Sequence, residues 1–351
     1  MNTLIVGDHF IGAEVFRAAI ERELGSDFGP VRTVMWAGAD MEEQHAEQQV
    51  MEKEGPEAVR SPGEIIEAVE GAEILAVHFA PVPTSLLEAS DSLKAVVVAR
   101  TGVENVNVDE ATRRGVAVVN IYGRNANAVA EQAVGLMLSE TRDIARQDAA
   151  VKTGAWPEES ASPVFELVGH TIGVIGLGNV GRKLARRLSG FEVRLLVYDP
   201  YVDACTIEEH GGEKVEDLSV IFRESDIVTL HARLTDETRR FIGRDQFELM
   251  KPTAYFINNA RSRMVDYDAL YDAVANNRIA GAALDVHDDE PLPADSPWRR
   301  LDNVTLSPHT AGVTPEVWTN SGQLVAEAIR EVADNGRATN TVNAHALEGS
   351  R

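Results

Sequence analysis

The chain has 351 residues, long for one domain and comfortable for two, and its hydrophobic content of 44% is ample for packed cores. A formal net charge of −23 speaks against nucleic acid or anionic membranes as partners. The single cysteine, Cys205, excludes a disulfide framework and a cysteine-based metal cage, and we expect it to be a small buried or half-buried residue.

The first 120 residues alternate short apolar segments with helical ones. We expect strands at 3–6, 31–36, 74–77, 95–99 and 117–119, and helices at 13–24 and 109–114. This alternation predicts a parallel sheet covered on both faces. The segment from Gly7 to Gly12 superficially resembles a phosphate-binding loop, but it lacks the GxG spacing and no acid follows at the right distance, so we interpret it as a turn. Residues 41–64 should form a polar helix and loop.

Two long helical patterns divide the chain. One covers 126–152, with Asn125 or Asn127 as its cap, and the other runs to about residue 333, with Thr314 as its cap. These helices would carry the chain into and out of an inserted domain. We therefore predict a discontinuous first domain at 1–125 plus 313–351, an inserted second domain at 126–312, and a polar, mobile tail from residue 335.

Residues 170–200 carry the most informative pattern: a strand, a glycine turn, a helix, a second strand and an acid. The first glycine of such a turn allows a tight bend, the second lets the backbone approach a pyrophosphate, and the third lets the helix lie close to the strand. These glycines are Gly176, Gly178 and Gly181. Free N–H groups at the helix start would hold the phosphates. We expect these contacts at Asn179, Val180 and the neighbouring Arg182.

The second strand of this unit, 193–198, ends at Asp199, eighteen residues beyond Gly181. An acid at this place accepts hydrogen bonds from the adenosine ribose hydroxyls and repels a 2′-phosphate. The sequence therefore predicts NAD rather than NADP as the cofactor.

The alternation continues after Asp199. Expected helices cover 218–222, 244–250 and 267–275, and expected strands cover 227–231, 254–258, 280–286 and 304–306. With the two strands of the glycine unit, they predict a doubly wound set of about six parallel strands.

Three motifs follow strand ends in the second domain. They are Asn258-Asn259-Ala260-Arg261, then Leu284-Asp285-Val286 with Glu290-Pro291, then Ser307-Pro308-His309-Thr310-Ala311-Gly312. Taken alone, Arg261 is compatible with a surface residue, Glu290 with a loop acid and His309 with a helix cap. All three motifs fall at the carboxyl ends of strands, where the nicotinamide of a bound dinucleotide must lie, and this placement favours a catalytic set.

The sequence resembles the D-isomer-specific 2-hydroxyacid dehydrogenase family, which includes phosphoglycerate, glycerate and D-lactate dehydrogenases. The resemblance covers about 93–312 and is carried by LKAVVVARTGVENVNVDEATRRGVAVVN, NANAVAEQAVGLML, GVIGLGNVGR, LVYDP, MKPTAYFINNAR, VDYDAL, GAALDVHDDEP and SPHTAG. It implies the α/β class, with a Rossmann NAD-binding domain inserted into a flavodoxin-like substrate domain. It also implies NAD-dependent interconversion of a D-2-hydroxy acid and its 2-keto acid.

The resemblance implies a role for each matching residue. Arg261 would hold the substrate carboxylate in a forked pair and polarise the keto oxygen. His309 would be the general acid in reduction and the general base in oxidation. Glu290 would bond the other ring nitrogen and fix its tautomer. The further cofactor contacts would be Ala260, Asp285, which would receive the nicotinamide carboxamide, and His231, which would touch the nicotinamide side only indirectly and be mainly structural.

Substrate recognition is the least determined part. Backbone N–H groups near Thr101 and Gly102 would bind the substrate carboxylate. Further candidates are Arg100, Arg124 and Asn125, and the sequence departs from the family's usual residues at Arg233 and Arg263. As a hypothesis, these arginines favour a sugar acid or its phosphate over lactate or pyruvate. Arg233 and Arg263 are equally compatible with exposed, solvated residues.

No basic, apolar leader opens the sequence, and no apolar run approaches the ~20 residues of a membrane span, so we expect a soluble, cytoplasmic protein. Six further histidines have no partner pattern, and we expect no metal site; they are His9, His45, His170, His210, His287 and His345. The resemblance implies a homodimer joined through the nucleotide domain. Two other functions stay open: an NADH-sensing, corepressor-like binding protein, and a phosphite or formate dehydrogenase of the same fold. Formate enzymes of this fold usually carry glutamine where Glu290 stands, so the acid argues against that reading.

Overall fold

The computed structural model describes residues 1–25, 28–36, 40–160 and 162–348. The chain forms two compact units, one built from Met1–Arg124 and Thr314–Arg351 and the other from Asn125–Val313. The expected boundaries, 126 and 312, differ from these by one residue at each end of the inserted unit.

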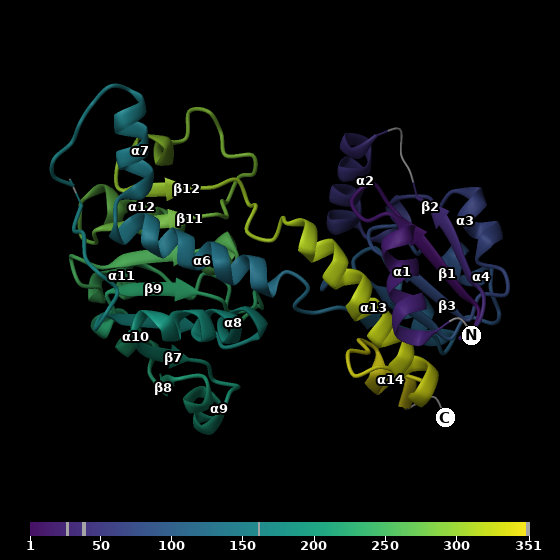
Figure 1. Ribbon diagram of the computed structural model, residues 1–351. Helices are drawn as coiled ribbons and strands as arrows, with labels where there is room; N and C mark the ends of the chain where they lie inside the picture. Colours follow the sequence, from purple (N-terminus) through teal and green to yellow (C-terminus); the bar gives the residue numbers. More distant parts are fainter. Residues whose placement is uncertain (26–27, 37–39, 161, 349–351) are drawn as a thin grey trace. The chain divides into compact units, whose positions relative to one another are not determined.

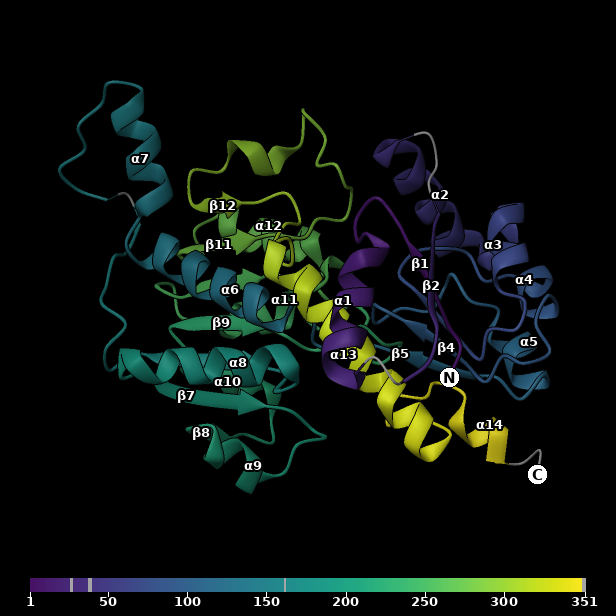
Figure 2. The same ribbon diagram turned by 45° about the vertical axis from the view of Figure 1, so that its right-hand side comes forward.

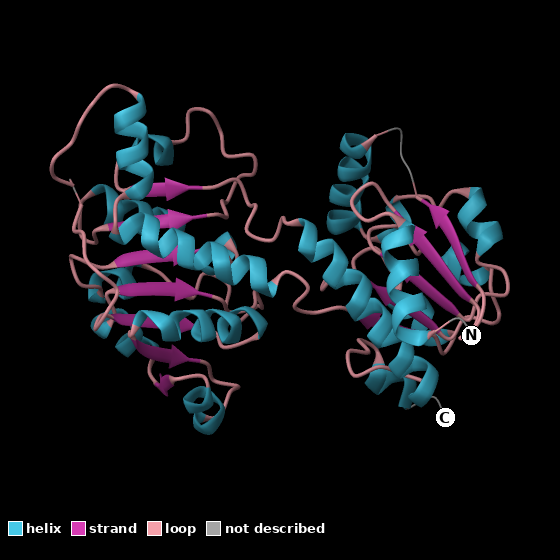
Figure 3. Ribbon diagram, viewed as in Figure 1, coloured by secondary structure: helices cyan, strands magenta, loops and turns pink. Residues whose placement is uncertain are grey.

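The first unit is built on a parallel sheet with helices around it (Figures 1 and 3). The sheet has five strands in the order β2-β1-β3-β4-β5. Every strand pairing is parallel. This order is that of flavodoxin-like folds and confirms the expected class. The strands are β1 (Thr3–Gly7), β2 (Val31–Met35), β3 (Ile74–Val77), β4 (Ala95–Val98) and β5 (Ala117–Asn120).

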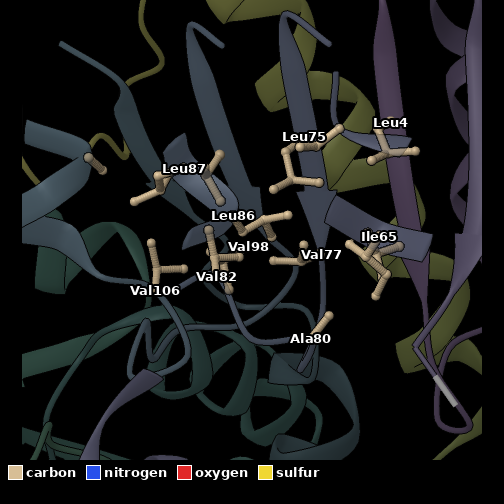
Figure 4. Close-up of a cluster of buried hydrophobic side chains, with 14 of the residues drawn as sticks. Leu4, Ile65, Leu75, Val77, Ala80, Val82, Leu86, Leu87, Val98 and Val106 are labelled. Atoms are coloured by element: carbon tan, nitrogen blue, oxygen red, sulfur yellow. The ribbon is translucent and has the colours of Figure 1, made fainter. Parts of the chain in front are cut away.

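Helices cover both faces of this sheet because alternate strand residues point to opposite sides. Leu4 and Val6 belong to the cluster shown in Figure 4, which lies under α3 and α4. Ile5 between them packs on the other face with α1 and α13. The helices of this unit are α1 (Ala13–Leu24), α2 (Met41–Glu54), α3 (Gly63–Ala68), α4 (Thr84–Glu88), α5 (Val108–Arg113), α13 (Pro315–Asn335) and α14 (Ala344–Glu348), with the 3₁₀ turn η1 (Pro56–Ala58).

The second unit contains a seven-stranded parallel sheet with the order β12-β11-β10-β9-β6-β7-β8. Read from β8, this is the doubly wound Rossmann order with one further strand, so the fold class is confirmed. We expected about six strands; β8 had not been predicted, because three residues are too few for a periodic signal. The strands are β6 (Thr171–Ile175), β7 (Arg194–Tyr198), β8 (Gly212–Lys214), β9 (Ile227–Leu230), β10 (Tyr255–Asn258), β11 (Gly281–Leu284) and β12 (Val304–Leu306).

Helices α6 and α8 cover one face of the second sheet, and α10, α11 and α12 cover the other. The helices of this unit are α6 (Ala126–Thr141), α7 (Ile144–Lys152), α8 (Asn179–Leu188), α9 (Ala204–Glu209), α10 (Leu218–Glu224), α11 (Arg244–Leu249) and α12 (Tyr267–Ala275), with the 3₁₀ turns η2 (Ser189–Phe191), η3 (Ser262–Met264) and η4 (Pro297–Arg300). No helix among the described residues is both long and apolar enough to cross a membrane.

The expected continuous helix over 126–152 is wrong. The chain breaks at Asp143, whose φ of 57° lies in the left-handed region, so α6 ends and α7 begins in a new direction. The Asp143 carboxylate bonds Arg146 and Ser160, and these contacts hold the bend. Figures 1 and 2 both show α7 and the loop after it standing away from the sheet of this unit.

Three smaller expectations also differ. The tail from residue 335 is held to the first sheet at Asn343: this buried side chain accepts a hydrogen bond from Val118 N at 2.9 Å and donates to Val116 O at 3.0 Å. Cys205 is exposed, because it lies in the first turn of the short surface helix α9. Thr314 stands at the N-cap of α13, but its side chain makes no capping hydrogen bond.

Candidate active site

The glycine turn leaves a cradle at the start of α8. Gly178 is the N-cap of α8 and, as a glycine, has no side chain to cap the helix. A Cβ built on it would meet nothing within 4 Å. A Cβ on Gly181 would meet Gly176 O at 2.3 Å, and Gly176 itself has a φ of 96°. The first-turn N–H groups of α8, including those of Asn179 and Val180, therefore face open space that suits an anion.

Two charged side chains frame this cradle. Asp199 Oδ2 accepts a hydrogen bond from Leu177 N at 2.8 Å, and its Oδ1 accepts one from Tyr201 N at 2.9 Å. Each carboxylate oxygen has a second lone pair, so Asp199 keeps capacity for ribose hydroxyls. The exposed Arg182 donates from Nε to Leu177 O at 3.1 Å, which ties its guanidinium to the glycine loop. The residues present fit a dinucleotide.

His231 follows β9 directly. Its Nε2 lies 2.9 Å from Thr229 Oγ1, and its buried Nδ1 has no hydrogen-bond partner in the described part of the chain. Burial lowers the pKa of His231 to about 4, so the ring is neutral at physiological pH. A neutral imidazole with a buried Nδ1 fits the structural role expected for it and does not suit general acid catalysis near pH 7.

Arg261 is presented by a turn that the fully buried Asn258 holds. Asn258 Oδ1 accepts from Ala260 N at 3.0 Å, and its Nδ2 donates to Arg261 O at 3.2 Å. The exposed Arg261 guanidinium donates from Nη1 to Ala260 O at 2.7 Å. The turn directs the arginine outward at the carboxyl end of β10, where the nicotinamide half of a dinucleotide lies in such sheets.

His309 and Glu290 form a hydrogen-bonded pair. His309 Nδ1 lies 2.7 Å from Glu290 Oε2, and 46% and 37% of the two side chains are exposed. Glu290 Oε1 accepts from His287 N at 2.9 Å, which orients the carboxylate. A carboxylate only accepts hydrogen bonds, so Nδ1 carries the proton. The Nε2 atom of His309 has no hydrogen-bond partner among the described residues and is available for proton exchange.

The loop that carries His309 is held by Asp285. This carboxylate is fully buried and accepts hydrogen bonds from four donors: Gln132 Nε2 at 3.0 Å, Ser307 Oγ at 2.5 Å, Thr310 N at 3.1 Å and Ala311 N at 2.9 Å. His309 has a φ of 56°, a conformation that costs of order 1 kcal/mol or more outside glycine and persists where neighbours determine it. The network around Asp285 provides that constraint. Contact of Asp285 with the nicotinamide carboxamide stays a prediction.

Gln132 had not been identified from the sequence, and Ser307 stood in one of the three motifs without an assigned role. Gln132 lies on α6, more than 150 residues before Asp285, and Ser307 is an ordinary strand-end serine. They reach the same carboxylate only because α6 packs against β11 and β12, and because β12 pairs with β11 in the sheet. Asn125, at the N-cap of α6, lies against Gly312: a Cβ on that glycine would meet Asn125 Nδ2 at 2.6 Å.

The substrate-binding candidates of the first unit lie at the carboxyl ends of its strands. Arg100 follows β4, and Thr101 and Gly102 continue this loop. Thr101 O accepts a hydrogen bond from Asn120 Nδ2 at 2.6 Å, and Ile121 N donates to Arg100 O at 3.0 Å, so the loop is fixed to the end of β5.

Arg100 itself is already neutralised. It pairs with Glu104 at 2.7 Å and Glu52 at 3.2 Å, and its guanidinium lies 4.7 Å from the centroid of the Phe79 ring. Its counter-charges therefore make it a weak candidate for binding an anion. Arg263 is an exposed residue of η3, and Arg233 follows β9; their substrate contacts stay predictions.

The described residues contain no group of three or more histidine, cysteine, aspartate or glutamate side chains that could hold a metal ion. The polar constellation of the second unit is instead a glycine cradle, an acid at the end of β7, an outward arginine and an exposed histidine–carboxylate pair. On a Rossmann sheet, these features define a dinucleotide-binding protein equipped for proton transfer.

Comparison with known proteins agrees with this class. Residues 134–311 match the family model described as "D-isomer specific 2-hydroxyacid dehydrogenase, NAD binding domain". The glyoxylate reductase of Korarchaeum cryptofilum is 35% identical over 301 residues. The matched region covers 84% of this chain and 89% of the length of that reductase. The chain belongs to the D-isomer-specific 2-hydroxyacid dehydrogenase family, and its second unit carries the family's NAD-binding domain. The expected family and cofactor are thus confirmed.

Other relatives differ in length or in identity. The D-3-phosphoglycerate dehydrogenase of Methanocaldococcus jannaschii is 38% identical over 281 residues, 80% of this chain but 53% of its own, so the chain spans about half the length of that relative. The NAD-complexed D-isomer-specific 2-hydroxyacid dehydrogenase of Lactobacillus delbrueckii ssp. bulgaricus has a TM-score of 0.77 over 98% of this chain and 100% of its own, at 23% identity. This last similarity shows the fold alone.

Proposed function

We propose that the protein is an NAD-dependent oxidoreductase that interconverts a D-2-hydroxy acid and its 2-keto acid. The observation that carries the proposal is the His309–Glu290 pair, with Nδ1 bonded at 2.7 Å and Nε2 open. Glyoxylate and hydroxypyruvate reductases at 35% and 36% identity support it.

The proposed reaction divides the work between the cofactor and three side chains. When bound, NADH supplies a hydride to the carbonyl carbon of the keto acid. The π pair of the C=O bond moves to oxygen, and His309 delivers the proton from Nε2 that turns this oxygen into a hydroxyl. Glu290 stabilises the imidazolium before transfer, and Arg261 holds the substrate carboxylate through its forked guanidinium. Oxidation runs the same steps in reverse.

The substrate class follows less directly. The relatives named glyoxylate reductase and D-3-phosphoglycerate dehydrogenase are similarly related to this chain, so their names do not choose between a two-carbon acid and a phosphorylated one. The arginine that follows β5, Arg124, favours a sugar acid or its phosphate. Backbone N–H groups near Thr101 and Gly102 would bind the carboxylate of either.

We further propose a homodimer joined through the second unit. Several large hydrophobic side chains are exposed on α7 and the loop after it: Ile144, Val151, Trp156, Val164 and Val168, with 80% of Trp156 accessible. Apolar surface gathered on one segment is typical of interfaces. Replacing Trp156 by serine should shift the mass measured by light scattering toward the monomer.

The test is NADH oxidation by the purified protein with glyoxylate, hydroxypyruvate, phenylpyruvate, and four- and five-carbon sugar keto acids with their phosphates. NADPH, formate and phosphite are run beside them. NADH-dependent reduction of a keto acid that His309→Ala abolishes and His210→Ala retains supports the proposal. Turnover of phosphite alone would reassign the reaction. NADH binding with no turnover across the panel would favour the corepressor-like sensor.

A further inference from the structure

The first unit holds a buried polar chain at the carboxyl edge of its sheet. Asp8 follows β1, His78 follows β3, and Arg124 lies four residues beyond β5. His78 Nδ1 is 3.0 Å from Asp8 Oδ2, and His78 Nε2 is 2.9 Å from Arg124 Nη1. The side chains of Asp8 and His78 are completely buried. Ligands of open α/β sheets bind at this edge.

The hydrogen-bonding capacity of the three groups fixes their protonation. Asp8 accepts from Phe10 N, Ile11 N and Phe79 N as well as from His78. Burial opposes the charge of Asp8, but these hydrogen bonds lower its pKa below the usual range. A carboxylate only accepts and a guanidinium only donates, so His78 must donate from Nδ1 and accept at Nε2. His78 is therefore neutral and in one tautomer; burial, against the opposing effect of Asp8, lowers its pKa to about 4.

Arg124 is oriented by this chain from one side only. Its Nη1 reaches His78 and, at 3.4 Å, Ser321 Oγ, and its guanidinium lies 5.6 Å from the centroid of the Trp318 ring. The Nε and Nη2 atoms have no hydrogen-bond partner among the described residues. That edge of a guanidinium is the fork that binds carboxylate or phosphate with two parallel bonds.

Arg124 also lacks a direct ion-pair partner, although the Asp8 carboxylate acts on its charge from the far side of His78. No carboxylate in the described part of the chain lies within ion-pair distance of it, whereas Arg100 has two such partners. Burial, followed by the neighbouring charge of Arg100, lowers the pKa of Arg124 to about 10, so it stays a cation at neutral pH. A partly buried cation with an open fork gains from an anionic ligand, because both its charge and its donors are then satisfied.

Resting on the proposed function, we propose that Arg124 binds a second anionic group of the substrate, a carboxylate or phosphate at the end remote from the keto group, and that Asp8 and His78 are the residues that position it. In the proposed function the first carboxylate is already assigned to Arg261 and to the Thr101–Gly102 backbone, so Arg124 has no role there and is left for the second group. Arg100, though at the same edge, is occupied by Glu52 and Glu104 and serves as the matched control.

The first experiment needs no turnover. Binding of inorganic phosphate to the full-length protein is measured by calorimetry with saturating NAD⁺, which fills the glycine cradle. Phosphate should bind to the wild type and to Arg100→Gln, and binding should weaken roughly 10- to 100-fold in Arg124→Gln. Equal binding by the wild type and Arg124→Gln would overturn the proposal, as would no binding by either.

The second experiment uses keto acids that differ only in the remote group. Arg124→Gln should raise KM for 3-phosphohydroxypyruvate roughly 10- to 100-fold and leave hydroxypyruvate within about twofold. Arg124→Lys keeps the charge without the fork and should fall between. An equal rise for both substrates would place Arg124 on the first carboxylate and overturn the proposal. If no keto acid reacts but phosphate binding still depends on Arg124, the result supports the anion site at Arg124 and contradicts the proposed enzymatic activity.

The positioning role has its own readout. His78→Gln keeps an oxygen able to accept from Arg124, whereas His78→Phe does not. His78→Gln should therefore retain most of the phosphate affinity that His78→Phe loses, at unchanged kcat for hydroxypyruvate. If His78→Phe does not fold, Asp8→Asn takes its place, because loss of the carboxylate frees the tautomer and should also weaken phosphate binding. If a folded His78→Phe or Asp8→Asn protein binds phosphate with wild-type affinity, the residue replaced in that variant does not position Arg124.

Discussion

The two units each contain a histidine paired with a carboxylate, and the pairs differ in almost everything but chemistry. The His78–Asp8 pair of the first unit is completely buried, and its second nitrogen is occupied by Arg124. The His309–Glu290 pair of the second unit is nearly half exposed, and its second nitrogen is open. Neither the residue types nor the Nδ1–oxygen distances, 3.0 Å and 2.7 Å, distinguish them.

The difference lies in what surrounds each ring. Burial and the Arg124 guanidinium both oppose a second proton on His78, so this ring can transmit orientation but cannot deliver a proton near neutral pH. The open Nε2 of His309 can exchange a proton with a substrate oxygen, and Glu290 stabilises the charged ring. A histidine–carboxylate pair is thus catalytic or positional according to its third partner and its access to solvent.

The largest expected effect is on the exposed pair. Glu290→Gln removes the charge that stabilises the His309 imidazolium and also permits the wrong tautomer, so kcat for keto acid reduction should fall roughly 10²- to 10⁴-fold. The free energy of unfolding should change little, because the Glu290 side chain is on the surface. Glu216→Gln, an exposed acid paired with Lys214, is the control. A kcat within about threefold of the wild type would remove Glu290 from the mechanism.

The buried pair should appear in the pH dependence of stability. His78 has a folded pKa of about 4 and an unfolded value near 6.5, so between these pH values the unfolded chain binds a proton that the folded chain does not. Stability should be full above pH 6.5 and fall by up to about 3 kcal/mol as the pH drops to 4. The charged groups facing His78 are Asp8, Arg124 and Arg100.

Urea unfolding of the wild type and His78→Gln at pH 8, 6 and 5 measures this effect. The variant should be less stable at pH 8 and lose less on acidification, while His210→Gln should follow the wild type. His231, with a pKa lowered to about 4 by burial, adds a slope of the same sign that both proteins share. Identical pH slopes for the wild type and His78→Gln would mean that His78 is not held neutral.

A smaller effect separates cofactor binding from packing in the glycine loop. A Cβ on Gly178 meets open space, so Gly178→Ala should keep the melting temperature and weaken NADH binding roughly tenfold, because it fills the phosphate cradle. A Cβ on Gly181 meets backbone at 2.3 Å, so Gly181→Ala should lower both affinity and stability. Fluorescence titration and thermal melts measure the two. An equal fall in melting temperature in Gly178→Ala and Gly181→Ala would contradict the assignment of Gly178 to phosphate binding and Gly181 to packing.

The smallest effect concerns cofactor choice. Asp199→Ser removes the charge that repels a 2′-phosphate, so the ratio of kcat/KM for NADPH to that for NADH should rise several-fold. Tyr201→Ser, a fully exposed neighbour, should leave the ratio unchanged. A constant ratio in Asp199→Ser would show that another residue selects NAD.

The sequence was sufficient for the glycine unit and for the strands of both sheets except β8, because continuous apolar runs such as 74–77 and 95–98 are what buried parallel strands require. It was insufficient for the helix break at Asp143, where contacts with Arg146 and Ser160 stabilise a conformation that helical periodicity does not reveal.

The candidate site shows the same limit. His309 and Glu290 lie in local motifs and could be proposed from the sequence. Asp8 and His78 lie 70 residues apart without any motif, and only the pairing of β1 with β3 brings them together. The division between Arg100 and Arg124 also had no sequence signal, because it depends on which carboxylates fold against each guanidinium.

The most direct test of the account places the same substitution in both pairs. For His309→Gln and His78→Gln, kcat for the best keto acid and the free energy of unfolding at pH 8 are measured on the same preparations. We predict that His309→Gln loses roughly 10²- to 10⁴-fold in kcat with unchanged stability, and that His78→Gln loses stability with kcat within about threefold. A large loss of kcat in His78→Gln, or retained kcat in His309→Gln, would contradict the assignment of proton transfer to the exposed pair.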